Sequence, residues 1–388
     1  MFVFSGDPVR TGRIDPEFAE EAGAARAAGA RCAVLGRAAL LAGDVPGAVA
    51  GVPYGAGAAW YRGRALPPER YGTLAAALGE RGCPLLTTPD SYRAARDSAG
   101  PYETFAGLAP DSRRPARTPG QPPGTARARV WWVDGEPVLV GAHPDTPGRC
   151  PRPDLSAVAP VVRAALRRLG CRFVTTDLAL RPAGGWRVTG VDDGQVGELP
   201  GGADSGTLIE TLATVGAGFP VALAAGRVVL RPVLPTAAAR LADQSALPGG
   251  TVWAGGEPPE PTVSCAEALV RAAAAGLYRP GWGLFTIVRA DDGTAVGSIC
   301  LHGPPDEDGT VEIGYALCPA ARGAGWATEA TRLLADWAAG RPEVRTVLAL
   351  TEAANEPSRR VLERAGFVPS DDRYGLRAHI FAGTGRFP

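Results

Sequence analysis

The sequence predicts a two-part chain: an N-terminal region of α/β and α+β character, then a domain with a mixed, mostly antiparallel sheet flanked by helices. Three observations predict this. Strand-like and helical patterns alternate early in the chain, a Pro- and Arg-rich stretch then interrupts them, and a later strand runs into a glycine loop that opens a helix. The 388 residues suit two to three domains. We expect lobes at 1–107 and 129–218, a linker at 108–128, and a domain at 226–388.

Composition limits the classes of partner. The chain has 40 basic and 40 acidic residues, and every basic residue is arginine. A net charge of zero gives no overall field to attract nucleic acid or an anionic membrane, so we expect neither as a partner. The seven cysteines contain no Cys-X-X-Cys pair, which predicts reduced thiols and no zinc site. With no leader-like or membrane-spanning segment, we expect a cytoplasmic protein.

The first lobe, 1–107, shows strand and helix patterns in alternation, which favours a small parallel sheet. Its strand candidates are 2–4, 32–35 and 84–86, and its helix candidates are Pro16–Ala28 and Tyr71–Arg81. The linker at 108–128 contains five prolines and no apolar periodicity, which is typical of a loop.

The second lobe, 129–218, begins with two apolar runs around Asp134-Gly135, a strong hairpin signal. A helix at Ala157–Leu169 and strands at Arg172–Leu180 and Trp186–Val191 are expected next. Three carboxylates accompany these strands: Asp177 on the first, and Asp192 and Asp193 beyond the second. Carboxylates on neighbouring strands suit a magnesium-nucleotide site, although Asp192-Asp193-Gly194 is also consistent with a simple turn.

This order of strands and carboxylates resembles the C-terminal part of ATP-grasp ligases, and Tyr61-Arg62-Gly63 with Tyr71 resembles the lobe that precedes it in one branch. The resemblance implies a site built on Arg62, Asp177 and Asp192. The family also uses lysines to hold the nucleotide, and this chain has none. Gly190 stands where the family carries a metal-binding glutamate. We therefore expect a degenerate ATP-grasp-like region with no metal and no ATP; an active carboxylate-amine ligase is the alternative.

The third region opens with a strand at Arg227–Pro232 after a boundary near 216–220. Helices are expected at Thr236–Gln244 and Cys265–Ala275. Strands of a mixed sheet are expected at Leu284–Arg289, Ala295–Leu301 and Thr310–Leu317. The loop 322–327, Arg-Gly-Ala-Gly-Trp-Ala, follows and opens a helix expected at Ala327–Ala339. Its glycines allow positive φ, and unpaired N–H groups of a first helical turn attract anions.

A second signal follows the strand 346–350. Asn355 is a good N-cap, Pro357 fits the first turn and Gly366 ends the helix. Together the two motifs resemble the GNAT acetyltransferases, and most closely the branch that acylates ribosomal-protein N-termini. That family's Arg/Gln-X-X-Gly-X-Gly/Ala loop is matched by 322–327, and its Asn-X-X-Ser helix start by Asn355 and Ser358.

The GNAT resemblance covers about 227–387 and implies acetyl-CoA as the acyl donor. It places the pyrophosphate on the loop amides, and backbone amides of the preceding strand on the acyl arm. The residues expected to bind acetyl-CoA are Ala316, Cys318, Arg322, Gly323, Ala324, Gly325, Trp326, Ala327 and Asn355, of which Asn355 is alternatively only a helix cap.

Direct attack by a primary amine requires a base, because an amine is largely protonated at neutral pH. Glu312 is the candidate, with a solvated strand residue as the alternative. By resemblance, Ser358 is the acid for the leaving thiolate, with a serine bonded to helix backbone as the alternative. We expect Cys318 to be structural, and His143, His302 and His379 to be isolated.

The sequence therefore predicts an acetyl-CoA-dependent N-acetyltransferase with a degenerate ATP-grasp-like region. The alternatives are a bifunctional protein that is also an ATP-dependent ligase, and a non-catalytic acyl-CoA sensor. The acceptor, a small-molecule amine or a protein N-terminus, would meet variable loops at 249–261 and 279–283. Trp253 and Trp282 either line that pocket or belong to the core.

Overall fold

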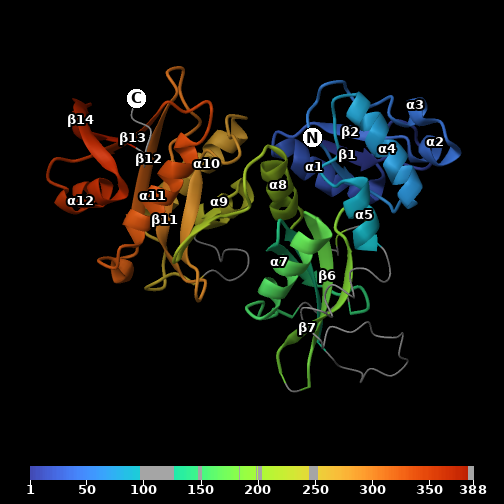
Figure 1. Ribbon diagram of the computed structural model, residues 1–388, viewed down its shortest axis with the longest axis horizontal. Helices are drawn as coiled ribbons and strands as arrows, with labels where there is room; N and C mark the ends of the chain where they lie inside the picture. The colour runs from blue at the N-terminus through green and yellow to red at the C-terminus, as the bar shows by residue number, and fades with distance from the viewer. Residues whose placement is uncertain are drawn as a thin grey trace. The chain divides into compact units, whose positions relative to one another are not determined.

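The computed structural model describes residues 1–96, 126–146, 151–182, 184–197, 199, 203–243 and 252–382. The chain divides into two compact units, Met1–Phe219 and Pro220–Pro388 (Figure 1). The part of the expected linker from 108 to 125 lies outside the described residues. Within the described ranges, no helix is long and apolar enough to cross a membrane.

The first unit contains a three-stranded sheet of order β2-β1-β3, and both pairings are parallel, as predicted. Its elements are β1 (Phe2–Ser5), η1 (Pro16–Phe18), α1 (Ala19–Ala27), β2 (Cys32–Leu35), α2 (Arg37–Ala42), α3 (Val45–Ala48), β3 (Trp60–Arg62), α4 (Pro68–Glu80) and α5 (Pro89–Arg96). All of β1 is buried, and Val3, Leu35 and Tyr61 pack with Tyr71 and Leu74 of α4 in one core.

The expected strand at 84–86 does not form. This segment contributes only a single bridge, between Ala59 and Leu85, and β3 takes the third place in the sheet. The physical reason is local: Pro84 has no N–H to donate, and Pro89 already begins α5.

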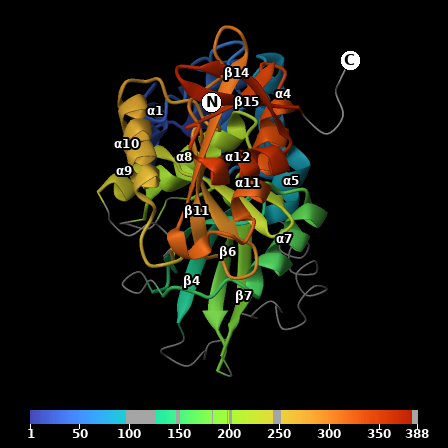
Figure 2. The ribbon, with the colours of Figure 1, turned by 90° about the vertical axis from the view of Figure 1, so that its left-hand side faces the viewer.

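The first unit also holds an antiparallel four-stranded sheet of order β5-β4-β6-β7. Its elements are β4 (Arg127–Val133), β5 (Glu136–Ala142), α7 (Val158–Leu169), β6 (Phe173–Leu180), β7 (Trp186–Asp193) and α8 (Ser205–Gly216). Figure 2 shows β4, β6 and β7 side by side with α7 beside them, where Val162 and Leu166 join the core.

The predicted hairpin is confirmed at its turn, where Asp134 and Gly135 both have positive φ, 49° and 83°. Two boundaries differ from expectation. β4 begins at Arg127, and β7 continues through Asp193, because Asp192 and Asp193 pair with Thr175 and Val174 of β6. The two aspartates are therefore strand residues, and a turn at Gly194 and Gln195 follows them, in which the Val196 N–H donates to Asp193 O at 3.4 Å.

The second unit is built on an eight-stranded sheet of order β14-β15-β13-β12-β11-β10-β9-β8. Its elements are β8 (Leu223–Ala225), β9 (Val228–Pro232), α9 (Pro235–Ala242), α10 (Glu260–Ala274), β10 (Leu284–Arg289), β11 (Ala295–Leu301), β12 (Thr310–Leu317), η2 (Pro319–Ala321), α11 (Trp326–Ala339), β13 (Thr346–Thr351), α12 (Glu356–Ala365), β14 (Phe367–Arg373) and β15 (Leu376–Phe381). The pairing of β12 with β13 is parallel and the others are antiparallel, so the predicted mostly antiparallel sheet is confirmed.

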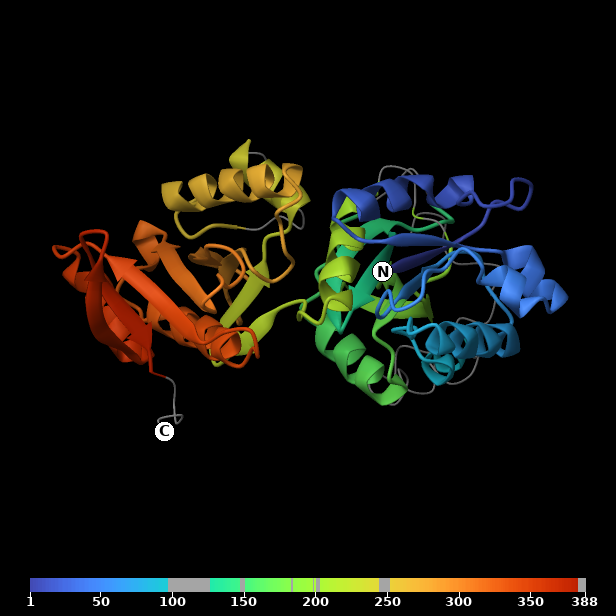
Figure 3. The ribbon, with the colours of Figure 1, turned by 90° about the horizontal axis from the view of Figure 1, so that it is seen from above.

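Helices lie against both faces of this sheet. α10 packs on β10 and β11, and α11 packs on β11, β12 and β13. Figure 3 shows α10, in gold, on one side of the sheet. α10 begins five residues before its expected start at Cys265, because Pro261 is accommodated in its first turn. The acceptor loop expected at 249–261 therefore ends in a helix, and its residues 249–251 lie outside the described residues.

Candidate active site

The site is organised by the separation of two parallel strands. β12 and β13 pair at Thr310–Thr346, Val311–Val347 and Glu312–Leu348, and no further pair joins these two fully described strands. Both continue beyond that point, and β12 stays paired on its other side with β11 as far as Leu317. One edge of β12 is therefore open to a ligand from Ile313 onward, with backbone N–H and C=O groups as its polar partners.

The phase of the β11–β12 ladder decides which amides face this open edge. The N–H of Cys318 donates to Val296 O at 2.9 Å, and the N–H of His302 donates to Glu312 O at 2.9 Å. Because facing directions alternate in an antiparallel pair, Ala316 also points its N–H toward β11. The open edge carries the amides of Tyr315 and Leu317. The expectation that the amides of Ala316 and Cys318 face the ligand was wrong by one residue. Neighbouring residues of a strand point their N–H groups to opposite sides, so a shift of one residue exchanges the two sides.

The glycine loop, residues 322–325, lies between the open edge of β12 and the start of α11. Gly323 and Gly325 have φ of 80° and 85°, a region that only glycine enters at low cost. α11 begins at Trp326, one residue before the expected start, with Gly325 as N-cap and no side chain bonded to the first amides. Residues 322–325 are exposed, so these N–H groups are available to an anion.

Arg227, which sequence reasoning did not single out, braces this loop. Its Nη2 donates to Ala324 O at 3.1 Å, its Nε donates to Glu329 Oε1 at 3.1 Å, and its guanidinium lies 4.4 Å from the centre of the Trp326 ring. Glu329 belongs to the first turn of α11, where an unpaired carboxylate would repel a bound anion. Pairing with Arg227 offsets that charge.

Glu312 is paired with a histidine. The two residues lie opposite each other on β12 and the end of β11, and His302 Nδ1 is 3.2 Å from Glu312 Oε1. The side chains are 49% and 33% exposed, so water reaches both. His302 was expected to be isolated; the expectation was wrong because cross-strand register, which brings the pair together, is not visible along the sequence.

A second pair of polar side chains bridges β12 and α12. Tyr315 Oη and Ser358 Oγ are 2.8 Å apart, and the Ser358 N–H donates to Asn355 Oδ1 at 3.2 Å. Asn355 thus caps α12, and the Ser358 hydroxyl contacts a tyrosine. Burial raises the pKa of Tyr315, with the Ser358 hydrogen bond opposing the rise. The phenol is therefore protonated at neutral pH.

The two polar pairs lie on opposite faces of the sheet. Cys300 contacts Cys265 of α10, so the strand face that carries Cys300, His302 and Glu312 is the α10 face. Tyr315, an odd number of residues from Glu312, reaches α12 on the other face. The open edge of β12 runs between these faces, with a carboxylate–imidazole pair on one side and two hydroxyl groups on the other.

The remaining candidate side chains of the second unit are buried. Cys318 is fully buried, and burial raises the pKa of its thiol, as expected of a packing residue. Trp253 and Trp282 are also buried, and the Trp282 ring lies 5.4 Å from the Trp337 ring at an interplanar angle of 53°, so both tryptophans belong to the core. His379 is buried in β15.

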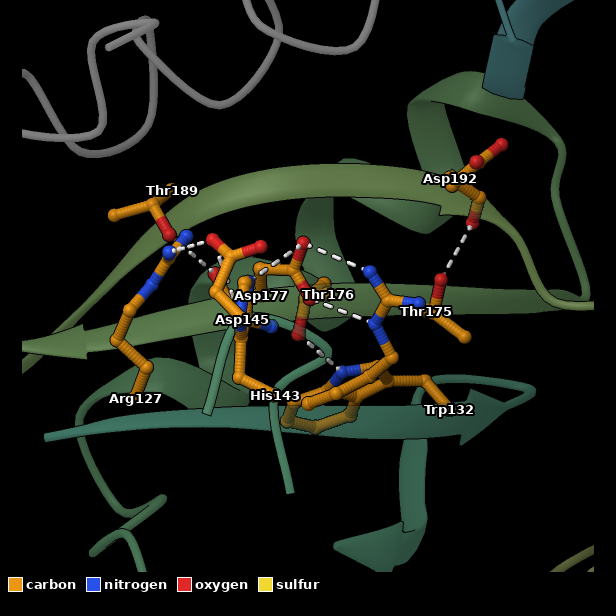
Figure 4. Close-up of polar contacts among 10 residues, drawn as sticks. Arg127, Trp132, His143, Asp145, Thr175, Thr176, Asp177, Thr189 and Asp192 are labelled. Carbon is orange, nitrogen blue, oxygen red and sulfur yellow. Dashed lines mark hydrogen bonds and ion pairs between the residues drawn. The ribbon is translucent and has the colours of Figure 1, made fainter. Parts of the chain in front are cut away.

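In the first unit, the candidate metal ligand Asp177 is paired with basic side chains (Figure 4). Arg129 binds Asp177 with both arms, Nε to Oδ1 at 2.7 Å and Nη2 to Oδ2 at 3.0 Å, and His143 Nε2 lies 3.5 Å from Oδ2. Burial alone would raise the pKa of Asp177, but His143 and Arg129 hold it well below its usual range. His143 was expected to be isolated; it instead contacts both Asp177 and Asp145.

The other two ATP-grasp candidates, Arg62 and Asp192, are also paired with side chains of opposite charge. Arg62 is fully buried, bonds both oxygens of Glu21 at 2.6 Å, and donates to Gly194 O at 2.7 Å. Asp192 is 3.2 Å from Arg96. Asp193 turns into the core, where burial raises its pKa to about 7.

The donor set does not fit a magnesium nucleotide. Gly190 lies opposite Asp177 in the β6–β7 ladder and offers no carboxylate, and a Cβ there would approach Asp177 Oδ2 to 2.9 Å. The Arg129 fork occupies the carboxylate face where a cation would coordinate. Across the described part of the chain, no group of three or more His, Cys, Asp or Glu side chains is arranged to hold a metal.

Models of known domains match both parts of the chain. Residues 227–368 match the model of the acetyltransferase (GNAT) domain, and residues 94–212 match the model of one clade of the ATP-grasp domain. The chain thus carries a GNAT acetyltransferase domain toward its C-terminus and an ATP-grasp domain in its N-terminal region. Both resemblances drawn from the sequence motifs are confirmed.

Individual relatives match the GNAT part. The Bacillus subtilis (strain 168) protein named uncharacterized N-acetyltransferase YjdG is 36% identical over 88 residues, which are 23% of this chain and 52% of YjdG. The chain therefore spans about half the length of that relative. An acetyltransferase of Agrobacterium tumefaciens str. C58 aligns at 24% identity and TM-score 0.30, over 42% of this chain and 94% of its own. The ribosomal L7/L12 alpha-N-protein acetyltransferase RimL, solved with coenzyme A, aligns at 14% identity and TM-score 0.29, over 41% and 96%.

Proposed function

We propose that the second unit is an acetyl-CoA-dependent N-acetyltransferase that transfers acetyl to a primary amine by direct attack, without a covalent enzyme intermediate. The observation that carries the proposal is the separation of β12 from β13 after Glu312, directly before the glycine loop and the start of α11. An open strand edge suits an extended amide-containing arm, and the helix start suits its pyrophosphate.

The two polar pairs supply the proton transfers. On the α10 face, Glu312 takes a proton from the attacking amine, and His302 holds the carboxylate in place and links it to water. The open-edge amides of Tyr315 and Leu317 are the donors for the thioester carbonyl oxygen, on which charge develops. On the other face, Tyr315 and Ser358 provide the proton for the departing thiolate.

The acceptor is proposed at the level of chemical class: a primary amine, on a small molecule or at a protein N-terminus. It approaches from the face that carries Glu312, since a general base must reach the proton it removes. The core positions of Trp253 and Trp282 remove these two side chains from the expected pocket lining.

We propose further that the ATP-grasp domain has no ligase activity and serves as a scaffold or recognition surface. The proposal is supported by the Arg129 fork on Asp177, the absence of a carboxylate at Gly190 and the complete burial of Arg62. Arginine does not substitute for the missing lysines, because its planar fork binds phosphate with a different geometry.

Calorimetric titration of the full chain separates the two domains. We expect acetyl-CoA to bind with a dissociation constant in the range of about 1 μM–1 mM, typical of enzyme substrates, and Mg-ATP to give no binding heat. The control is Asp177→Ala, which should leave the acetyl-CoA titration unchanged. Mg-ATP binding that disappears in Asp177→Ala would show that the first unit retains a nucleotide site and would restore the bifunctional alternative.

The hydroxyl pair gives a separate prediction. Tyr315→Phe and Ser358→Ala should each lower kcat, by about 10²-fold for the residue that delivers the proton, and the double variant should lose little more than the worse single. A thioester whose leaving thiol is more acidic should recover most of the loss, since its thiolate needs no proton. Tyr374→Phe is the matched control, because Tyr374 is 93% exposed in the β14–β15 turn. An equal loss with both thioesters would assign the pair a packing role.

A further inference from the structure

Two thiols meet where α10 crosses β11. Cys265 Sγ, on the helix, is 3.8 Å from Cys300 Sγ, on the strand. A disulfide requires about 2.05 Å between the sulfurs, so the gap to close is roughly 1.8 Å. Side-chain torsions and a small shift of a helix that packs on a sheet can supply a movement of this size.

A second contact holds the helix in register with the strand. Thr262 Oγ1 and Ser298 Oγ are 2.7 Å apart, and both residues are buried. Thr262 precedes Cys265 by three residues, which is nearly one helical turn, and Ser298 precedes Cys300 by two, which is one strand repeat. Both contacts therefore arise from one alignment of α10 against β11. Ala266, also buried, lies on the same helix next to Cys265. The backbones of helix and strand at the two cysteines therefore stay aligned as long as the neighbouring contact is kept.

The two thiols differ in access and acidity. Cys265 is half-buried and Cys300 is 6% exposed. The hydrogen bond between them lowers the pKa of Cys265 to about 7, against the effect of burial, and raises the pKa of Cys300. By contrast, burial raises the pKa of Cys32, the other half-buried thiol of the described residues. An accessible thiolate beside a protected thiol is the arrangement in which oxidation proceeds in two steps.

We propose that Cys265 and Cys300 form a redox-active dithiol whose substrate class is a hydroperoxide. With hydrogen peroxide, the Cys265 thiolate attacks one peroxide oxygen, the O–O bond breaks, and a sulfenic acid forms while hydroxide leaves and takes a proton to give the first water. The Cys300 sulfur then attacks the sulfenic sulfur, the S–O bond breaks, and a second water leaves. In total, two thiols and one hydrogen peroxide give one disulfide and two waters.

The position of the disulfide predicts what it does to the domain. Cys300 is two residues from His302 and lies on the strand face that carries Glu312. The crosslink therefore ties α10 to the face from which the amine is proposed to approach, and it leaves the glycine loop untouched. Resting on the proposed function, we expect oxidation to lower kcat/KM for the amine by about 5- to 150-fold, the usual size of coupling between sites, with the acetyl-CoA dissociation constant unchanged.

The chemical test does not depend on acetyl transfer. The reduced full chain is treated with hydrogen peroxide, free thiols are alkylated, and the protein is cleaved after arginine. Cys265 lies in the fragment 241–271 and Cys300 in the fragment 290–322, which also contains Cys318. We expect these fragments to be joined, with a mass two hydrogens below their sum, in wild type and in Cys318→Ser but not in Cys300→Ser. Dithiothreitol should separate them.

Cys265→Ser, at the more exposed position, serves as the second variant if Cys300→Ser fails to fold. A crosslink that survives Cys265→Ser, or oxidation of Cys265 to the sulfinic acid with Cys300 still free, would overturn the proposal. Activity is scored separately, on protein with the crosslink confirmed by mass. A crosslinked protein whose reduced form acetylates no amine would sustain the dithiol and count against the proposed function instead.

Discussion

Replacing Gly325 by glutamate should weaken acetyl-CoA binding by about 30- to 700-fold. The residue has φ of 85°, and a side chain there costs about 1–2 kcal/mol in backbone strain. The new carboxylate would also lie at the N-terminus of α11, in the position proposed for the pyrophosphate, where lost anion binding adds about 1–2 kcal/mol. Together these terms raise the dissociation constant by about 30- to 700-fold. Calorimetric titration of wild type and variant measures the change.

The chain supplies a closely matched control for this variant. Gly375 has φ of 78° in the exposed β14–β15 turn, and no atom lies within 4 Å of a Cβ built there. Gly375→Glu adds the same charge at the same backbone conformation away from the proposed site, so it should bind acetyl-CoA like wild type. Gly325→Ala isolates the strain from the charge. Equal binding by Gly325→Glu and Gly375→Glu would mean that the anion site lies elsewhere.

Local signals in the sequence were sufficient for several parts of the structure. The Asp134-Gly135 turn, the Asn355 cap and the glycine start of α11 each depend on residues within a few positions of one another. Such features follow from backbone preferences and short-range hydrogen bonds, which a single sequence displays directly. The two family resemblances rested on the same kind of motif.

Features that depend on register were not predictable in the same way. The pairs His302–Glu312 and Tyr315–Ser358 join residues on separate elements, and their contact requires a particular alignment of strand against strand or helix. The orientation of the Cys318 amide has the same origin, because one residue of slip in the β11–β12 ladder reverses it. Sequence periodicity places a residue on a face of an element but leaves the partner element's alignment open.

The first unit illustrates both cases. The absence of a carboxylate at Gly190 and of lysine throughout could be seen in the sequence. The pair of hydrogen bonds from Arg129 to Asp177 could not be seen in the sequence, since it depends on the register of β4 against β6. In physical terms, the Arg129 guanidinium supplies the positive charge that the partly buried Asp177 carboxylate needs.

Replacing Glu312 by glutamine should lower kcat by about 10²- to 10⁴-fold, the usual contribution of a positioned general base. The amide keeps the size of the side chain and a contact to His302, but it cannot accept a proton. The acetyl-CoA dissociation constant should not change, because the glycine loop and the open edge of β12 are untouched. Steady-state kinetics and calorimetry together measure both quantities. Glu307→Gln, in the exposed β11–β12 loop, is the matched control.

The pH dependence of this variant separates a base from a packing residue. Without a base, the reaction uses only the neutral amine, whose fraction rises about tenfold per pH unit up to an amine pKa of about 8 for an α-amine or about 10.4 for a lysine-like one. The Glu312→Gln rate should therefore climb toward the wild-type rate as pH rises, and His302→Ala should show a smaller loss of the same form. A kcat within about twofold of wild type at neutral pH would show that Glu312 is a solvated strand residue. Loss of a general base must lower kcat at a pH at which most of the amine is protonated.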